Sequence, residues 1–212
     1  MSVTRRRAAF GLGAGILAAA CVGQADEAAA ADLTPPQTEG PFFPRDTNVE
    51  RDLDLTRLAG RSGRAAGQII EVRGRVLDAD GRPIQGAQLD MWQANAAGRY
   101  DHPGDNQNAA PLDPNFQSYA RLTTGADGAY RLISVRPGGY DSPIGHRTPH
   151  LHWKARAGAR ALTTQMYFPG EAANAEDELY RALANPMLAV AQAADATDEG
   201  ALAFEWNIVL PA

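Results

Sequence analysis

Short segments that alternate between apolar and polar residues recur along this chain, separated by residues typical of turns. The clearest lies at residues 68–77 (QIIEVRGRVL) and is followed by the turn signal DADGRP. Successive side chains of a strand point to opposite faces of a sheet, so this alternation indicates strands with one buried face. The same reasoning predicts strands at residues 87–92, 129–135, 150–157, 163–168 and 203–210. We therefore predict an all-β fold, an antiparallel β-sandwich of about seven short strands.

Two segments depart from this alternation. Residues 26–66 are polar, and four prolines between residues 35 and 44 interrupt any regular element, so we expect an extended N-terminal arm that lies over the sandwich. One short helix is predicted near residues 175–184, because acids open the segment and apolar residues recur at helical spacing. A chain of 212 residues fits one globular domain, which we place at residues 67–212.

The first 25 residues have the shape of a signal peptide. Three arginines, Arg5 to Arg7, precede an uncharged stretch rich in Gly and Ala, and the first acid is Asp26. The adjacent arginines resemble a twin-arginine leader, which belongs to a pathway that exports folded proteins. We expect cleavage near Ala25 and a periplasmic or secreted product without stable membrane association. Two alternatives stay open, an uncleaved membrane anchor and a lipoprotein lipidated at Cys21.

Charge and cysteine content exclude some functions. The chain carries 20 Lys and Arg against 25 Asp and Glu, a net charge of -5, and has no basic run after the leader. We therefore expect no nucleic-acid partner. The only cysteine, Cys21, falls within the leader. A cleaved product would contain no thiol, which excludes disulfides and cysteine catalysis.

A His-x-His triplet is the first sign of a metal site. His150 and His152 alternate on a predicted strand, so both imidazoles would project from one face within reach of one ion. The alternative is a pair of ordinary histidines on a solvated sheet face. Tyr100 and Tyr140 each stand where a predicted strand gives way to a loop. Spacing alone does not make them ligands, because tyrosines in such places commonly cap a sandwich core.

Three longer stretches carry more specific information. They are WQANAAGRYDH with the following APLDPNF, the run from TTGADGAYRL to PGGY, and RTPHLHW with TQMYFPGE; an EGPFF segment precedes them. These motifs resemble the intradiol ring-cleavage dioxygenase family, and within it the iron-bearing beta subunits of protocatechuate 3,4-dioxygenases. The similarity covers residues 39–210. It implies an enzyme that opens a catechol ring between its two hydroxyl-bearing carbons with O2, giving a muconate-type diacid.

The resemblance also implies a non-haem Fe(III) site. Tyr100 and His150 match the equatorial ligands of the family, and Tyr140 and His152 match the axial ligands. Two phenolates and two imidazoles form a hard, anionic donor set that favours ferric iron and differs from the thiolate sets of structural zinc. A tyrosine with an ordinary pKa of about 10 ionises at neutral pH only beside such a cation. Charge transfer from phenolate to iron would colour the protein burgundy.

Further roles follow from the same resemblance. Tyr140 would leave the metal when the diol binds and act as a base, Arg147 would stabilise negative charge on the ring, and Gln165 matches a pocket glutamine. A second interpretation of Arg147 is a surface arginine paired with an acid such as Asp141.

The two remaining histidines, His102 and His146, have no counterpart in the motifs, and we interpret both as loop residues. If His146 replaced His150 as a ligand, its loss would bleach the protein.

A non-catalytic binding module is an alternative function, because the DADGRPI and DGAYRL segments also resemble transthyretin-like sandwich domains.

If the protein is a dioxygenase, its substrate stays open. Residues 141–143 replace an aromatic-containing stretch of the protocatechuate pattern. Catechol, hydroxyquinol or a larger lignin-derived diol therefore stands beside protocatechuate as a substrate. The protein could form a homo-oligomer or pair with a related partner subunit.

Overall fold

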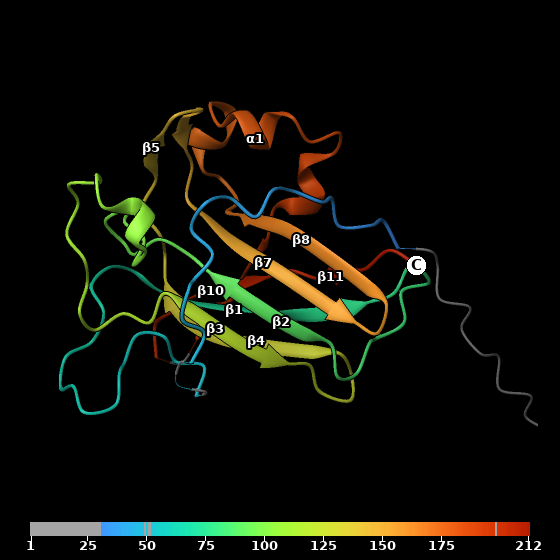
Figure 1. Cartoon of the computed structure of the whole chain (residues 1–212). Coiled ribbons are helices and arrows are strands. Elements are labelled where there is room, and N and C mark those ends of the chain that lie inside the picture. The colour runs from blue at the N-terminus through green and yellow to red at the C-terminus, as the bar shows by residue number, and fades with distance from the viewer. Residues whose placement is uncertain (1–30, 49, 51, 198) are drawn as a thin grey trace, which may run out of the picture.

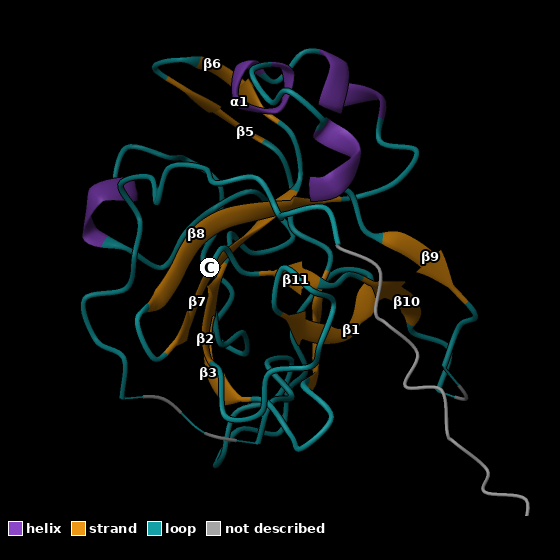
Figure 2. Ribbon diagram, turned by 90° about the vertical axis from the view of Figure 1, so that its right-hand side faces the viewer, coloured by secondary structure: helices purple, strands orange, loops and turns teal. Residues whose placement is uncertain are grey.

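The computed structural model describes residues 31–48, 50, 52–197 and 199–212, so the predicted leader lies outside the described residues. The described chain folds into two packed β-sheets (Figures 1 and 2). One sheet has the strand order β3-β2-β7-β8, and the other holds β1, β4, β9, β10 and β11. A small hairpin, β5-β6, stands apart from both. The predicted all-β sandwich is confirmed.

The strand bounds are β1 (Ile69–Leu77), β2 (Gln88–Trp92), β3 (Tyr119–Thr123), β4 (Ala129–Val135), β5 (Tyr140–Ser142), β6 (Gly145–Arg147), β7 (His150–Ala157), β8 (Arg160–Tyr167), β9 (Gln192–Ala194), β10 (Leu202–Glu205) and β11 (Ile208–Val209). The helical segments are the 3-10 turns η1 (Pro103–Asp105), η2 (Ala172–Ala175) and η3 (Pro186–Ala189) and the α-helix α1 (Glu178–Arg181). Five of the six predicted strands match β1, β2, β4, β7 and β8 closely, whereas β3, β5, β6 and β9 were not predicted. No helix among the described residues is long and apolar enough to cross a bilayer.

Alternation along β7 sets the two faces of its sheet. Leu151, Trp153 and Ala155 are fully buried between the layers, where they pack in the main hydrophobic core. Because neighbouring side chains of a strand point to opposite faces, His150 and His152 project from the outer face. The same strand thus anchors the sandwich and presents both imidazoles on one side.

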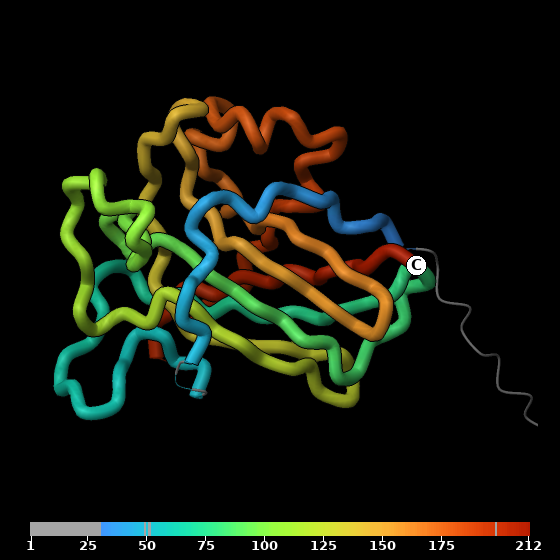
Figure 3. Tube along the Cα trace, viewed as in Figure 1, coloured from blue at the N-terminus to red at the C-terminus, as the bar shows by residue number. Residues whose placement is uncertain are grey.

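The arm covers this outer face. The blue part of the tube in Figure 3 crosses β7 and β8. Backbone and side-chain hydrogen bonds hold it there, since the amide of Gln37 donates to the carbonyl of Thr163 at 2.8 Å and the Thr164 hydroxyl donates to the carbonyl of Pro35 at 2.8 Å. Further along, Leu55 is fully buried in the core. The described part of residues 31–66 contains no helix or strand longer than an isolated bridge, as expected for an extended arm.

The final predicted strand, residues 203–210, is two strands instead. Both β10 and β11 run parallel to β1, in contrast to the wholly antiparallel sandwich expected. Between them the carbonyl of Trp206 lies over Gly74, where a Cβ atom would come within 1.8 Å of the oxygen. Asn207 then accepts a hydrogen bond from the amide of Arg75 through its side chain. A side chain takes the place of a backbone partner at this step, which interrupts the strand.

The predicted helix at residues 175–184 is present but shorter. The carboxylate of Asp177 accepts hydrogen bonds from the amides of Leu179 and Tyr180, so it caps α1 and fixes its start at Glu178. The helix ends after one turn, before Asn185 and Pro186 begin η3. The prediction was right in type and wrong in length, because the acids that were expected inside the helix include its cap.

A buried charge ties three strands together on the outer face of the first sheet. Asp90 on β2 is 2% exposed and accepts hydrogen bonds from the Tyr119 hydroxyl, from Arg121 Nε at 2.7 Å and from Arg156 Nη1 at 3.0 Å. Burial raises the pKa of Asp90, but the hydrogen bonds from Arg121 and Tyr119 outweigh it, and the net pKa is lowered. The folded state therefore favours the charged carboxylate.

We expect Asp90→Asn to lower the free energy of unfolding by about 2 kcal/mol at pH 7, because it weakens hydrogen bonds to a charged group. A folded pKa below the unfolded one means that this contribution is complete above about pH 4 and is lost as the pH falls through the folded pKa. Urea titrations of both proteins between pH 3 and pH 7 measure the difference. The control Asp127→Asn, at an exposed pair with Arg75, should change stability by less than about 0.5 kcal/mol. Equal losses in the two variants would contradict the assignment.

Candidate metal centre

Three of the four predicted ligands meet at one end of the outer sheet face. Tyr100 Oη lies 3.1 Å from His152 Nε2 and 3.5 Å from His150 Nε2, and the two Nε2 atoms lie 3.1 Å apart. All three side chains are at most 3% exposed. The histidines come from β7, and the tyrosine comes from the loop after β2. The interpretation of these histidines as residues on a solvated face is wrong.

The loop that carries Tyr100 is shaped by its own polar residues. The side-chain oxygen of Asn95 accepts hydrogen bonds from the amides of Ala97 and Arg99, which folds the chain back after β2. The amide of Tyr100 then donates to the carboxylate of Asp105 at 2.8 Å. These contacts turn the phenol toward the β7 histidines, as the ligand prediction requires, and the alternative of a simple core cap does not describe it.

Tyr140, the fourth predicted ligand, reaches the same place from the first residue of β5. Its ring lies 5.5 Å from the Tyr100 ring, nearly perpendicular to it, and 5.8 Å from the His150 ring. Gly98 has a positive φ of 79°, and a Cβ atom on it would lie 2.2 Å from the carbonyl oxygen of Gly139. Only glycine permits this close approach, which brings together the two segments that carry Tyr100 and Tyr140.

The converging atoms fit a single cation. Nitrogen and oxygen ligands bound at roughly 2.0 to 2.2 Å from one ion lie about 3 to 3.5 Å from each other, which is the spacing of Tyr100 Oη and the two Nε2 atoms. His150 Nδ1 lies 2.6 Å from the carbonyl of Thr148 and can only donate to it, so the Nε2 lone pair is left for a metal. The part of the chain that the structure describes has no cluster of three or more His, Cys, Asp or Glu suited to a metal. The tyrosines are therefore needed to complete the donor set.

Burial sets the protonation states of these side chains. It lowers the pKa of both His150 and His152, with the Arg147 charge acting in the same direction, so both imidazoles are neutral and able to act as ligands. Burial also raises the pKa of the Tyr100 hydroxyl well above its usual value, and the nearby Tyr140 hydroxyl adds to the shift. A phenolate at Tyr100 therefore requires a cation beside it.

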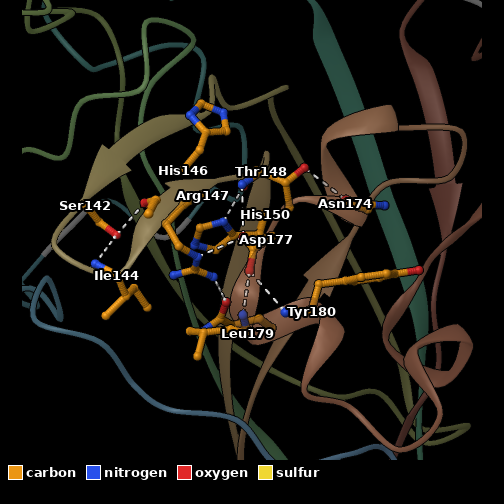
Figure 4. A network of polar contacts seen from close by, with 12 residues as sticks. Ser142, Ile144, His146, Arg147, Thr148, His150, Asn174, Asp177, Leu179 and Tyr180 are labelled. Carbon is orange, nitrogen blue, oxygen red and sulfur yellow. Dashed lines mark hydrogen bonds and ion pairs between the residues drawn. The ribbon is translucent and has the colours of Figure 1, made fainter.

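Arg147 lies next to this cluster and is buried, with 5% of its surface exposed. Its Nε donates to Asp177 at 2.8 Å (Figure 4). Its Nη2 donates to Gln165 at 2.6 Å. The interpretation of Arg147 as a surface arginine paired with Asp141 is wrong, because Asp141 pairs with His146 at 2.8 Å. Gln165 is fully buried between Arg147 and the arm, where it donates to the carbonyl of Thr38.

The other two histidines stay outside the donor cluster. His102 is a loop residue, as expected, and its ring accepts a hydrogen bond from the amide of Gly104 at the start of η1. His146 lies in strand β6 and not in a loop, with 44% of its side chain exposed. Its place in the β5-β6 hairpin was missed because each strand has only three residues.

Several residues at the site carried no assigned role in the sequence. Trp92 stacks on His152 with ring centroids 4.8 Å apart, and Phe42 from the arm packs on Tyr100 at 4.6 Å. Phe42 lies in the EGPFF segment, which signalled the family but not a contact with the tyrosines. Asp177 was expected only at the start of a helix, and no sequence signal pairs it with Arg147.

A hollow of about 620 Å³ lies on the other sheet, lined in part by Arg73, Arg131, Trp206 and Met187. It holds none of the predicted ligands. The buried, converging donors mark the chemical site better than this open hollow does. A binding module of the same fold has no need to bring two tyrosines, two histidines and a buried arginine together, so the non-catalytic alternative loses its support.

Comparisons with known proteins agree with this geometry. A family model described as Dioxygenase matches residues 38–212. The beta chain of protocatechuate 3,4-dioxygenase from Burkholderia cepacia is 43% identical over 169 residues, which are 75% of this chain and 71% of that protein. The hydroxyquinol 1,2-dioxygenase of Nocardioides simplex is 31% identical over 155 residues, and the match covers 66% of this chain but only 49% of that protein.

Solved structures give the same answer. The dioxygenase domain of a dioxygenase and carbohydrate-binding fusion from Streptomyces sp. SirexAA-E superposes with a TM-score of 0.65 at 32% identity, covering 85% of this chain and 99% of that one. An intradiol ring-cleavage dioxygenase from Tetranychus urticae has a TM-score of 0.65 at 20% identity, covers 85% of this chain and 95% of its own, and supports the fold alone. The chain belongs to the intradiol ring-cleavage dioxygenase family.

Proposed function

We propose that this protein opens the ring of a catechol-type diol between its two hydroxyl-bearing carbons with molecular oxygen, using a non-haem ferric ion. The observation that carries the proposal is the convergence of Tyr100, His150 and His152 within 3.5 Å of one another, with Tyr140 beside them. The product would be a muconate-type dicarboxylate. Family membership supports the reaction class.

The four side chains that would hold the ion are Tyr100, Tyr140, His150 and His152. When bound, ferric iron would supply a Lewis-acidic, electron-accepting centre that activates a chelated diol toward oxygen. The protein's part is to keep two imidazoles neutral and two phenols close enough to ionise beside the cation. Stacking of Trp92 on His152 and packing of Phe42 on Tyr100 support two of these rings and keep water away from them.

Tyr140 is the side chain best placed to move a proton. It is less buried than Tyr100, since it lies at the start of the β5-β6 hairpin. Burial raises the pKa of Tyr140, and the positive charge of Arg147 opposes this shift. If a bound cation ionises Tyr140, the raised pKa makes its phenolate a strong base that can take a proton from a diol hydroxyl and become a neutral phenol. The adjacent guanidinium would stabilise the negative charge left on the diol.

The substrate is a protocatechuate-like or other catechol-type diol. The 43% identity to a protocatechuate 3,4-dioxygenase beta chain supports protocatechuate, and the weaker similarity to hydroxyquinol and catechol 1,2-dioxygenases keeps those diols as candidates. The relatives also include an alpha chain of protocatechuate 3,4-dioxygenase from Pseudomonas putida at 33% identity. A homo-oligomer or a complex with a related subunit is part of the proposal.

The metal proposal is tested by iron content and colour. We expect the purified protein to hold about one ferric ion per chain and to show a broad visible charge-transfer band. The band should shift when protocatechuate or catechol is added without oxygen, and the size of the shift at low concentration ranks the diols. His150→Ala should lose both iron and colour, whereas the control His146→Ala should keep them. A colourless protein that cannot be loaded with iron would sink the proposal.

The role of Arg147 is tested by Arg147→Gln. We expect kcat to fall by about 100-fold or more, because the variant removes a preorganised charge from the site. Iron content should change by less than about 2-fold, since Arg147 is not in the donor set. Oxygen-uptake rates and metal analysis of the same samples measure the two effects. Parallel loss of iron and turnover would assign Arg147 to holding the metal site together.

We also propose that the protein is exported, which rests on residues 1–25 alone. Loading a buried metal site before transport suits a pathway that carries folded proteins. Cell fractionation should find the protein outside the cytoplasm with a shortened N-terminus. Replacing Arg5 and Arg6 with lysine should hold it inside. Cytosolic protein with residues 1–25 intact would contradict export.

A further inference from the structure

Asp177 is a buried carboxylate that bridges two segments of the site. It is fully buried at the start of α1 (Figure 4). Helix α1 lies beside the β5-β6 hairpin (Figure 2). One oxygen accepts from the amides of Leu179 and Tyr180 at 2.9 and 3.0 Å. The other accepts from Arg147 Nε at 2.8 Å and from the amide of Thr148 at 3.0 Å. Each oxygen thus serves a different element.

The contact with Arg147 fixes the plane of its guanidinium. Asp177 holds the Nε edge and Gln165 holds Nη2, and neither contact uses Nη1. A guanidinium is rigid and planar, so two anchors at separate nitrogens leave it no free rotation. The N–H groups of Nη1 are then held in a fixed orientation. Burial lowers the pKa of Arg147, but the neighbouring Tyr140 oxygen and the Asp177 carboxylate raise it by more, so the net pKa is raised and the guanidinium stays charged.

The contact with Thr148 extends to a predicted ligand. The Thr148 amide donates to Asp177, and its hydroxyl donates to Asn174 at 2.9 Å. The Thr148 carbonyl in turn accepts from His150 Nδ1 at 2.6 Å. Because this last bond sets which nitrogen of His150 carries the proton, a shift of Thr148 would disturb the ligand. The Asp177 carboxylate therefore holds both the Arg147 guanidinium and the Thr148 backbone behind the His150 imidazole.

A capping role alone does not account for an acid at this position. Serine and asparagine cap helices as well as aspartate does, and Asn185 caps η3 with its amide oxygen. Burying a charge pair costs desolvation energy that an apolar pair would avoid. What the carboxylate adds is its second oxygen, which faces Arg147 and Thr148.

We propose that Asp177 is a positioning residue that aims Arg147 at the bound diol and steadies the Thr148 carbonyl behind His150. The proposal rests on the proposed ring-cleavage function, because the aim of Arg147 matters only if a charge develops beside it. The acid does not touch the diol or the metal donors.

The test is a double-mutant cycle between Asp177→Ser and Arg147→Gln in the iron-loaded protein. Serine keeps the helix cap and removes the oxygen that holds Arg147. We expect Asp177→Ser to lower kcat about 10- to 100-fold, the scale of losses caused by small misplacements of catalytic groups. In the Arg147→Gln background the same change should cost less than about 3-fold, since residues that act through one another are not additive. Asp177→Asn, which keeps the shape of the side chain, serves as the second variant.

Two readouts do not depend on turnover. Iron content of Asp177→Ser should stay within about 2-fold of the wild type, because no donor atom is changed and Asn174 still holds Thr148 through the Thr148 hydroxyl. In the iron-free protein, the NMR signal of the Arg147 Nε proton should move or broaden in Asp177→Ser. The control Asn185→Ala removes the cap of η3, which accepts from the Met187 amide and has no hydrogen bond to Arg147, so it should leave kcat and that signal unchanged.

The outcomes separate the two proposals. Equal losses of kcat in both backgrounds, or an unmoved Arg147 signal, would overturn the positioning role while leaving the ring-cleavage function intact. Loss of iron in step with loss of turnover would also overturn it, because Asp177 would then only hold the fold. A wild-type protein that neither binds iron nor consumes oxygen with any diol would overturn both.

Discussion

The site depends on polar rings held out of water with their donor atoms facing one another. Tyr100, His150 and His152 are almost fully buried, and the two Nε2 atoms and the phenol oxygen lie within 3.5 Å of each other. Buried polar groups need partners, and neutral imidazoles turned toward each other do not provide enough of them. A cation at the centre would resolve this and would also ionise the phenols, which burial alone keeps protonated. Its binding would therefore contribute to the stability of this end of the sandwich.

The predicted ligands come from two kinds of element, a rigid core strand and more adaptable segments at the end of the sandwich. The histidines stand on β7, whose other face carries Leu151 and Trp153 in the core, so packing of the sandwich fixes both imidazoles. Tyr100 comes from a loop and Tyr140 from the first residue of β5, and Gly98 and Gly138 permit an approach of these two segments that a side chain would block. The less buried Tyr140, which would take a proton from the diol in the proposed reaction, suits the adaptable part. Rigid imidazoles suit a site that must keep its geometry while that happens.

Contacts around the donors join segments that are far apart in the chain. Gln165 on β8 links Arg147 on β6 to the carbonyl of Thr38 in the arm, and Asp177 links Arg147 to α1. The arm also packs Phe42 on Tyr100. Displacing the arm would thus open one wall of the site and remove a support of Gln165. The site is therefore complete only when the arm lies on the sheet.

The sequence by itself determined the fold class, most of the strands and the residues that meet at the site. Alternation in residues 68–77 and 150–157 reports burial of one face, which is a local property of a strand. Family motifs supplied the tyrosines, which spacing left as core caps. Only the tertiary structure decided that the last strand splits beside Gly74, that β10 and β11 run parallel to β1, and that Arg147 pairs with Asp177 and not with Asp141. These features arise from contacts between residues 30 or more positions apart, or from competition between two acids for one cation, and no local pattern encodes them.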